Sequence, residues 1–145
     1  MRSAVLFAAV AMLAPAAIAA DFKSVGGSPA VMYDAPSERG RKVFVAPRGM
    51  PVEVILSYGE WAKVRDVSGD LSWVEAKVLD ARRHVIVNAA GGKVRSAADE
   101  ASPVVFTAER GVLLELAEPI SSGWIKVRHR DGQGGYIRSS DVWGD

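Results

Sequence analysis

The sequence predicts an all-β protein made of two similar five-stranded β-barrels in tandem. Three observations support this fold class. The chain repeats itself, its apolar segments are short and separated by glycine-containing turns, and sustained helical periodicity is missing. Single helical turns are expected only at residues 75–79 and 139–142. Closure into a small barrel is favoured because it leaves no sheet edge exposed.

The first twenty residues predict a signal peptide. Arg2 precedes an apolar run over residues 3–13, and the small residues of 17–19 suit a signal peptidase, with cleavage after Ala19 or Ala20. The run falls short of the roughly 20 residues that span a bilayer, so an uncleaved anchor is the less favoured alternative. We therefore expect export to the periplasm, with no stable membrane span after processing.

The repeat defines the two barrels, which we expect at residues 22–80 and 84–144. Aligning the copies requires one extra residue in the second copy. The aligned pairs include Val43 and Phe44 with Val105 and Phe106, Arg48 and Gly49 with Arg110 and Gly111, and Trp61 with Trp124. Only residues 81–83 lie between the copies, which predicts a nearly fixed relation between them.

Each copy contains the same expected elements in the same order. A turn at Arg48 and Gly49 precedes a strand at 51–56, and a hairpin turn at Ser68 and Gly69 joins strands 61–66 and 71–74. The second copy repeats this with strands at 112–116, 124–129 and 134–137. Val43, Phe44 and their counterparts Val105 and Phe106 are expected to fill the cores.

Composition excludes several classes of protein. Removal of Arg2 with the signal would reduce Lys and Arg from 18 to 17, equal to the 17 Asp and Glu, and a neutral exported protein lacks the basic face that nucleic acids require. Without cysteine there is neither a disulfide nor a cysteine zinc site. His84 and His129 stand in no metal-ligand spacing and beside no serine motif, so we expect neither enzyme activity nor a cofactor.

Aromatic and cationic side chains alternate with the aliphatic ones. If Ile125 and Val127 face the core, then Trp124, Lys126 and Arg128 face outward, and the first copy repeats the pattern. The returning strands would place Trp73 beside Trp61 and Tyr136 beside Trp124. The candidate ligand-binding residues are therefore Trp61, Lys63, Arg65, Trp73, Trp124, Lys126, Arg128 and Tyr136.

These aromatic platforms would suit a sugar ring or an extended proline-rich peptide, with the cations available for a carboxylate. Two alternatives remain open. The rings could form cross-strand pairs that cover the barrel flank, or the two barrels could pack on them. The triplet Met32, Tyr33 and Asp34 resembles the groove-lining start of eukaryotic peptide-binding SH3 domains, although local strand structure is the favoured interpretation.

The second copy resembles the bacterial SH3-like (SH3b) domain. The resemblance is carried by residues 94–99, 110–111, 123–128, 131–132 and 135–137; the first copy departs from it at Leu71 and Ser72, which replace a glycine pair. It implies two tandem five-stranded barrels that bind cell-wall material or protein segments. We therefore expect a non-enzymatic module for peptidoglycan or its stem peptides, or alternatively a periplasmic adaptor that binds an extended segment of another envelope protein.

Overall fold

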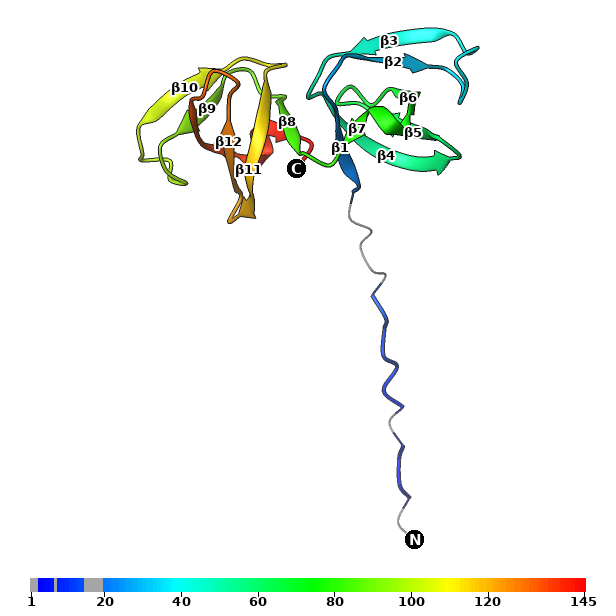
Figure 1. Cartoon of the computed structure of the whole chain (residues 1–145). Coiled ribbons are helices and arrows are strands. Elements are labelled where there is room, and N and C mark those ends of the chain that lie inside the picture. The colour runs from blue at the N-terminus through cyan, green and yellow to red at the C-terminus, as the bar shows by residue number, and fades with distance from the viewer. Residues whose placement is uncertain (1–2, 7, 15–19) are drawn as a thin grey trace.

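The computed structural model describes residues 3–6, 8–14 and 20–145. Figure 1 shows two curled β units side by side, with residues 3–6 and 8–14 lying away from them. Residues 3–6 and 8–14 have no regular secondary structure, and the expected small-residue cleavage motif at 17–19 lies outside the described residues. Within the described part of the chain, no helix has the length and apolar character needed to cross a membrane.

The first unit is one antiparallel sheet of seven strands, with the order β3-β2-β6-β5-β4-β1-β7. A short 3-10 turn, η1 (Ala76–Val78), precedes its last strand. The strands are β1 (Phe22–Val25), β2 (Ala30–Tyr33), β3 (Lys42–Ala46), β4 (Pro51–Tyr58), β5 (Trp61–Arg65), β6 (Leu71–Glu75) and β7 (Leu79–Asp80).

The second unit repeats the same topology, with the order β10-β9-β13-β12-β11-β8-β14 and the 3-10 turn η2 (Ser139–Asp141). Its strands are β8 (His84–Val87), β9 (Gly92–Arg95), β10 (Val104–Ala108), β11 (Leu113–Ser121), β12 (Trp124–Arg128), β13 (Gly134–Arg138) and β14 (Val142–Trp143). The identical strand orders confirm the duplication and the all-β class.

The strand count differs from the five expected in each unit. The last strands, β7 and β14, have two residues each and pair with β1 and β8 after the single 3-10 turns. Two residues are too few for a sequence period to reveal. Among the described strands the pairing runs from β3 to β7 and from β10 to β14 without a ladder that joins the ends. The units are therefore strongly curled sheets rather than closed barrels.

Glycines occupy the turns where the sequence places them. Gly49 and Gly111 have φ of 83° and 90° before the long strands β4 and β11. Gly69 and Gly132, in the hairpins β5–β6 and β12–β13, have φ of 87° and 95°. These are backbone conformations that side chains with a Cβ rarely adopt. The predicted turns are confirmed.

Each unit has its own core, built from alternate residues of the central strands. Ala62 and Val64 of β5 are buried in the first unit, and Ile125 and Val127 of β12 are buried in the second. The prediction of which strand face is aliphatic and internal is therefore correct.

The prediction that residues 43–44 fill the core is wrong. Phe44 is 48% exposed and Val45 is 61% exposed, and on β3 only Ala46 is buried. The physical reason is that β3 is the end strand of its sheet, with β2 as its one hydrogen-bonded neighbour. In the second unit Val105 is likewise exposed, whereas Phe106 packs against the core.

The two units contact each other directly beside the short link. Phe22 and Trp143 pack edge to face with ring centroids 5.0 Å apart, and the Arg83 guanidinium donates a hydrogen bond of 2.6 Å to the Gly144 carbonyl. The main-chain N–H of His84 donates to Ser24 Oγ at 3.0 Å. The C-terminus therefore lies between the units, as Figure 1 shows.

Candidate functional site

The aromatic pairing in the first unit differs from the expected platform. The β5–β6 register places Trp61 opposite Glu75 and Lys63 opposite Trp73, so the two tryptophans are offset along the hairpin. Trp61 is half-buried and packs edge to face against Tyr33, with centroids 5.5 Å apart. The expected pairing of Trp61 with Trp73 is therefore wrong, because the register of the hairpin and not the spacing within each strand decides which rings meet.

In the second unit, the expectation that Trp124 presents an open ring is wrong. Trp124 is only 7% exposed, and the guanidinium carbon of Arg138 lies 4.5 Å from its ring centroid. Glu100 holds this guanidinium with a hydrogen bond of 2.7 Å from Arg138 Nε. Tyr136 is not beside Trp124 in the ladder, because it pairs with Lys126.

The cations of the predicted platform have carboxylate or aromatic partners. Lys63 Nζ lies 5.9 Å from the Trp73 ring centroid, and Lys126 Nζ lies 6.0 Å from that of Tyr136. The ion pairs are Arg65 with Glu53 at 3.4 Å, Arg128 with Glu115 at 3.0 Å and Lys126 with Glu118 at 3.2 Å. Exposed pairs of this kind are weak, so a ligand could replace them, and the binding role of the eight residues stays a prediction.

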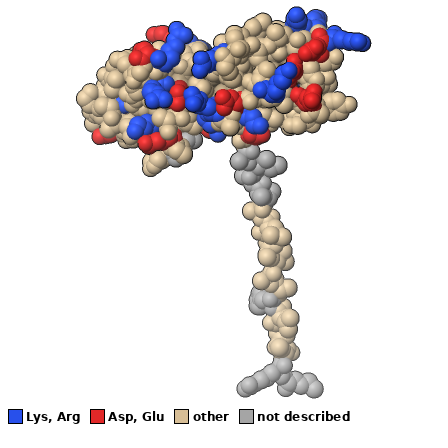
Figure 2. Space-filling model, in the orientation of Figure 1, with Lys and Arg blue, Asp and Glu red and all other residues tan. Residues whose placement is uncertain are grey.

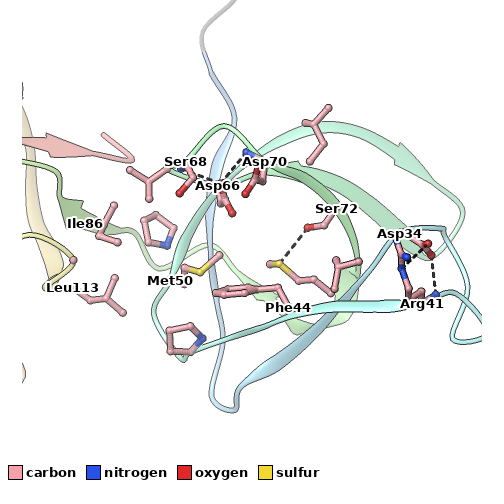
Figure 3. A pocket seen from close by; sticks show the side chains of 17 residues that line it. Asp34, Arg41, Phe44, Met50, Asp66, Ser68, Asp70, Ser72, Ile86 and Leu113 are labelled. Carbon is pink, nitrogen blue, oxygen red and sulfur yellow. Dashed lines mark hydrogen bonds and ion pairs between the residues drawn. The ribbon is translucent and has the colours of Figure 1, made fainter.

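A deeper feature, which we call the apolar groove, opens on the first unit and reaches the second (Figure 3). Its volume is about 630 Å³. The apolar part of its lining is Met32, Val43, Phe44, Pro47, Met50, Pro51, Val67, Leu71, Ile86 and Leu113. Phe44 lies outside the core, and its exposed ring forms a wall of this groove.

The polar lining of the groove is mainly acidic. Asp34, Asp66 and Asp70 stand against the single cation Arg41 in the lining. Arg41 is tied to Asp34, since its main-chain N–H donates to Oδ1 at 2.8 Å. Asp66 Oδ1 accepts the main-chain N–H groups of Ser68 and Asp70, both at 3.0 Å, and this turn geometry fixes the carboxylate at the rim.

The groove was not predicted from the sequence, although two of residues 32–34 line it. Met32 and Asp34 line the groove, while Tyr33 between them packs on Trp61. The interpretation as local strand structure is confirmed for Met32 and Tyr33, which lie in β2, and Tyr33 is outside the groove lining. Phe44 gave no signal, because the sequence of a short apolar strand does not show whether its side chains are covered.

A second hollow, the inter-unit cleft, has a volume of about 580 Å³ and is lined by residues of both units, including His84 and His129. His129 Nδ1 lies 3.1 Å from Asp131 Oδ2, two residues away in the same hairpin turn. The main-chain N–H of Gln133, and then His129, lower the pKa of Asp131 below its usual range.

Comparison with known proteins identifies the family of this chain. The model of the bacterial SH3 domain family matches residues 26–80 and, a second time, residues 88–144. No curated protein matches the chain.

Three solved structures resemble the chain at low identity. NlpC2 from Trichomonas vaginalis has 12% identity and a TM-score of 0.40, over 88% of this chain and 49% of that one. NlpC1 from the same organism has 11% identity and a TM-score of 0.41, over 91% of this chain and 48% of that one. An NlpC/P60 family protein from Bacillus cereus has 16% identity and a TM-score of 0.39, over 84% of this chain and 55% of that one. The chain thus spans about half the length of the solved structures it matches.

Proposed function

The chain belongs to the bacterial SH3 domain family, and from this premise we propose that it is an exported, non-enzymatic module that binds peptidoglycan through its stem peptides. The domains found are binding modules, which supports a role in recognition. The expected signal peptide at residues 1–20, the periplasmic location and the domain boundaries 22–80 and 84–144 belong to this proposal.

The apolar groove is the observation that carries the proposal. A stem peptide is a short extended chain with small methyl side chains and a free amine. Val43, Phe44 and Leu71 offer an exposed apolar surface for the methyl groups, and the rim carboxylates of Asp66 and Asp70 offer acceptors for the amine. An apolar lining with a few polar groups at its edge is typical of sites for small extended ligands.

The aromatic face remains a second part of the proposed surface. Trp73 with Lys63, and Tyr136 with Lys126, are half-buried rings with a cation nearby, an arrangement that suits a sugar ring. The groove lining contains neither Trp73 and Lys63 nor Tyr136 and Lys126. Glycan and peptide would therefore be bound on different surfaces.

Sedimentation with purified sacculi tests the proposal. We expect the chain to sediment, and Phe44→Ala to reduce the bound fraction several-fold because it removes a groove wall. Val45→Ala is the matched control, since Val45 lies on the same strand, is more exposed and is outside the groove lining. Absence of sedimentation would contradict wall binding. Equal binding by Phe44→Ala and Val45→Ala would contradict the groove, and unchanged binding by Trp73→Ala would argue against the aromatic face.

The second candidate function is an adaptor for an extended segment of another envelope protein. The observation that favours it is the end strand β3, which carries exposed Val43, Phe44 and Val45 in a row. An end strand with free hydrogen-bonding groups accepts an added strand from a partner. Val45→Lys should then abolish capture of a partner from an envelope extract while sacculus binding persists.

A further inference from the structure

The inter-unit cleft is rich in positive charge. Its walls are the turn that contains Gly49 in the first unit, the link between the units, and the hairpin start that contains His129 in the second. The charged residues in the lining are Arg48, Arg82, Arg128, Arg130, Asp80 and Glu115. In Figure 2 several Lys and Arg side chains lie near the middle of the two-unit body, interspersed with acidic ones, and another basic group lies at the upper right end.

The two carboxylates of the cleft are already engaged. Glu115 pairs with Arg128 at 3.0 Å, and Asp80 Oδ1 accepts the main-chain N–H of Arg82 at 2.8 Å. Within the described part of the chain, no carboxylate lies within 4.0 Å of the guanidinium groups of Arg48, Arg82 or Arg130. Four arginines against two carboxylates leave the charged lining of the cleft at +2, in a chain whose net charge is only +1.

The internal repeat shows that the basic residues of the hairpin, unlike Arg48, are particular to one unit. The apolar groove combines the first unit's hairpin turn, with Asp66 and Val67, and the second unit's turn at Gly111. The cleft combines the equivalent elements of the opposite units, namely the turn at Gly49 of the first unit and the β12–β13 hairpin of the second. In the alignment of the copies Asp66 corresponds to His129, and Val67 to Arg130. The start of the hairpin turn therefore carries an acidic and an apolar residue in the groove, and two basic residues in the cleft.

The walls of the cleft are held in place by contacts between the units. The His84 ring lies against Gly49, where an added Cβ would be 3.3 Å from the ring carbon Cδ2. The main chain of His84 is itself hydrogen-bonded to Ser24 of the first unit. The main-chain segments that carry the arginines are therefore held together by these contacts, which reduces the entropy lost when a ligand is bound between the units.

We propose that the inter-unit cleft is a binding site for an anionic ligand, held through its phosphate or carboxylate oxygens by Arg48, Arg82 and Arg130. A guanidinium donates two parallel hydrogen bonds to either kind of anion, and such charge-assisted bonds are the strong ones. The site adjoins the apolar groove, with which it shares Leu113, but its three arginines lie outside the groove lining, whose rim is acidic. It goes beyond wall-peptide binding and gives the two hollows opposite ligand preferences.

Amide chemical-shift titration of the full chain tests this site. Inorganic pyrophosphate is the phosphate probe, citrate is the carboxylate probe, and sodium chloride at matched ionic strength is the reference. We expect saturable shifts at Gly49, His84 and Arg130. Arg48→Gln should weaken binding about tenfold, the effect of losing one hydrogen bond to a charged group.

Arg110→Gln is the matched control. Arg110 occupies the equivalent turn of the second unit and is outside the cleft lining, so this variant should bind like the unmodified chain. Saturation by pyrophosphate alone assigns the site to phosphate groups, and saturation by citrate alone assigns it to carboxylates. Shifts no larger than those with sodium chloride, or an equal loss in Arg110→Gln, would overturn the site. Arg48→Gln should still sediment with sacculi, so this failure is distinguishable from failure of the wall-binding proposal.

Discussion

Two equivalent tryptophans show how single residues decide what the repeat exposes. Trp61 stands opposite Glu75 in its hairpin, and Trp124 stands opposite Arg138. Glu75 is drawn to Lys77, 2.9 Å away, and this hydrogen bond lowers the pKa of the Glu75 carboxyl. Arg138 instead lies over the indole and covers it. The cross-strand neighbour thus decides the exposure of each ring. Arg138 covers Trp124, whereas Glu75 leaves Trp61 half-buried.

Removing the covering cation should expose the second indole. In Arg138→Ala we expect a red shift of the tryptophan fluorescence and a loss of about 1 kcal/mol of unfolding free energy, since the cation–π contact is removed. Urea unfolding followed by fluorescence measures both. Lys126→Ala is the control, because it removes a cation near Tyr136 and leaves Trp124 covered. An unchanged emission maximum in Arg138→Ala would show that the guanidinium does not shield the ring.

Strand β13 shows at the scale of an element why the two copies differ in sequence. Gly135 lies so close to β9 that an added Cβ would clash with the Arg95 carbonyl and reach within 2.9 Å of Val94 Cγ1. The equivalent residue of β6 is Ser72, whose Oγ lies 3.3 Å from Met32 Sδ. The first copy thus has room for a side chain where the second has none, and Ser72 lines the apolar groove.

Gly135→Ala should therefore destabilise the second unit. We expect a loss of about 2–3 kcal/mol in unfolding free energy, because the methyl group forces apart the β13–β9 pair. Ser72→Ala is the matched substitution in the first unit and should change stability by less than about 1 kcal/mol. Thermal unfolding of both variants provides the comparison. Equal effects would mean that the close approach of β9 is relaxed without difficulty.

At the scale of the whole molecule, the junction between the units determines both hollows. Gly144 lies at this junction with φ of 111°, and an added Cβ would be 2.9 Å from Pro51 Cβ and 3.0 Å from the His84 carbonyl oxygen. Pro51 lines the apolar groove, and His84 lines the inter-unit cleft. A change at this one position therefore affects both proposed sites.

Gly144→Ala should loosen the junction. We expect the two units to tumble more independently in NMR relaxation, and anion binding in the cleft to weaken, because the walls are no longer held together. Gly132→Ala is the control. It has a similar φ of 95° but open space around the added Cβ, so it shares the backbone strain without the clash. Identical relaxation in the two variants would contradict a coupling through Gly144.

The sequence by itself determined the class of the fold, its duplication, the turns at Gly49 and Gly69, and the faces of β5 and β12 that form the cores. These features depend on local chemistry, since strand alternation and positive φ are properties of a few neighbouring residues. Only the tertiary structure decided that Phe44 leaves the core, that Arg138 covers Trp124, and that two hollows lie at the junction. Such features depend on strand register and on contacts between residues far apart in the chain, which no local pattern encodes.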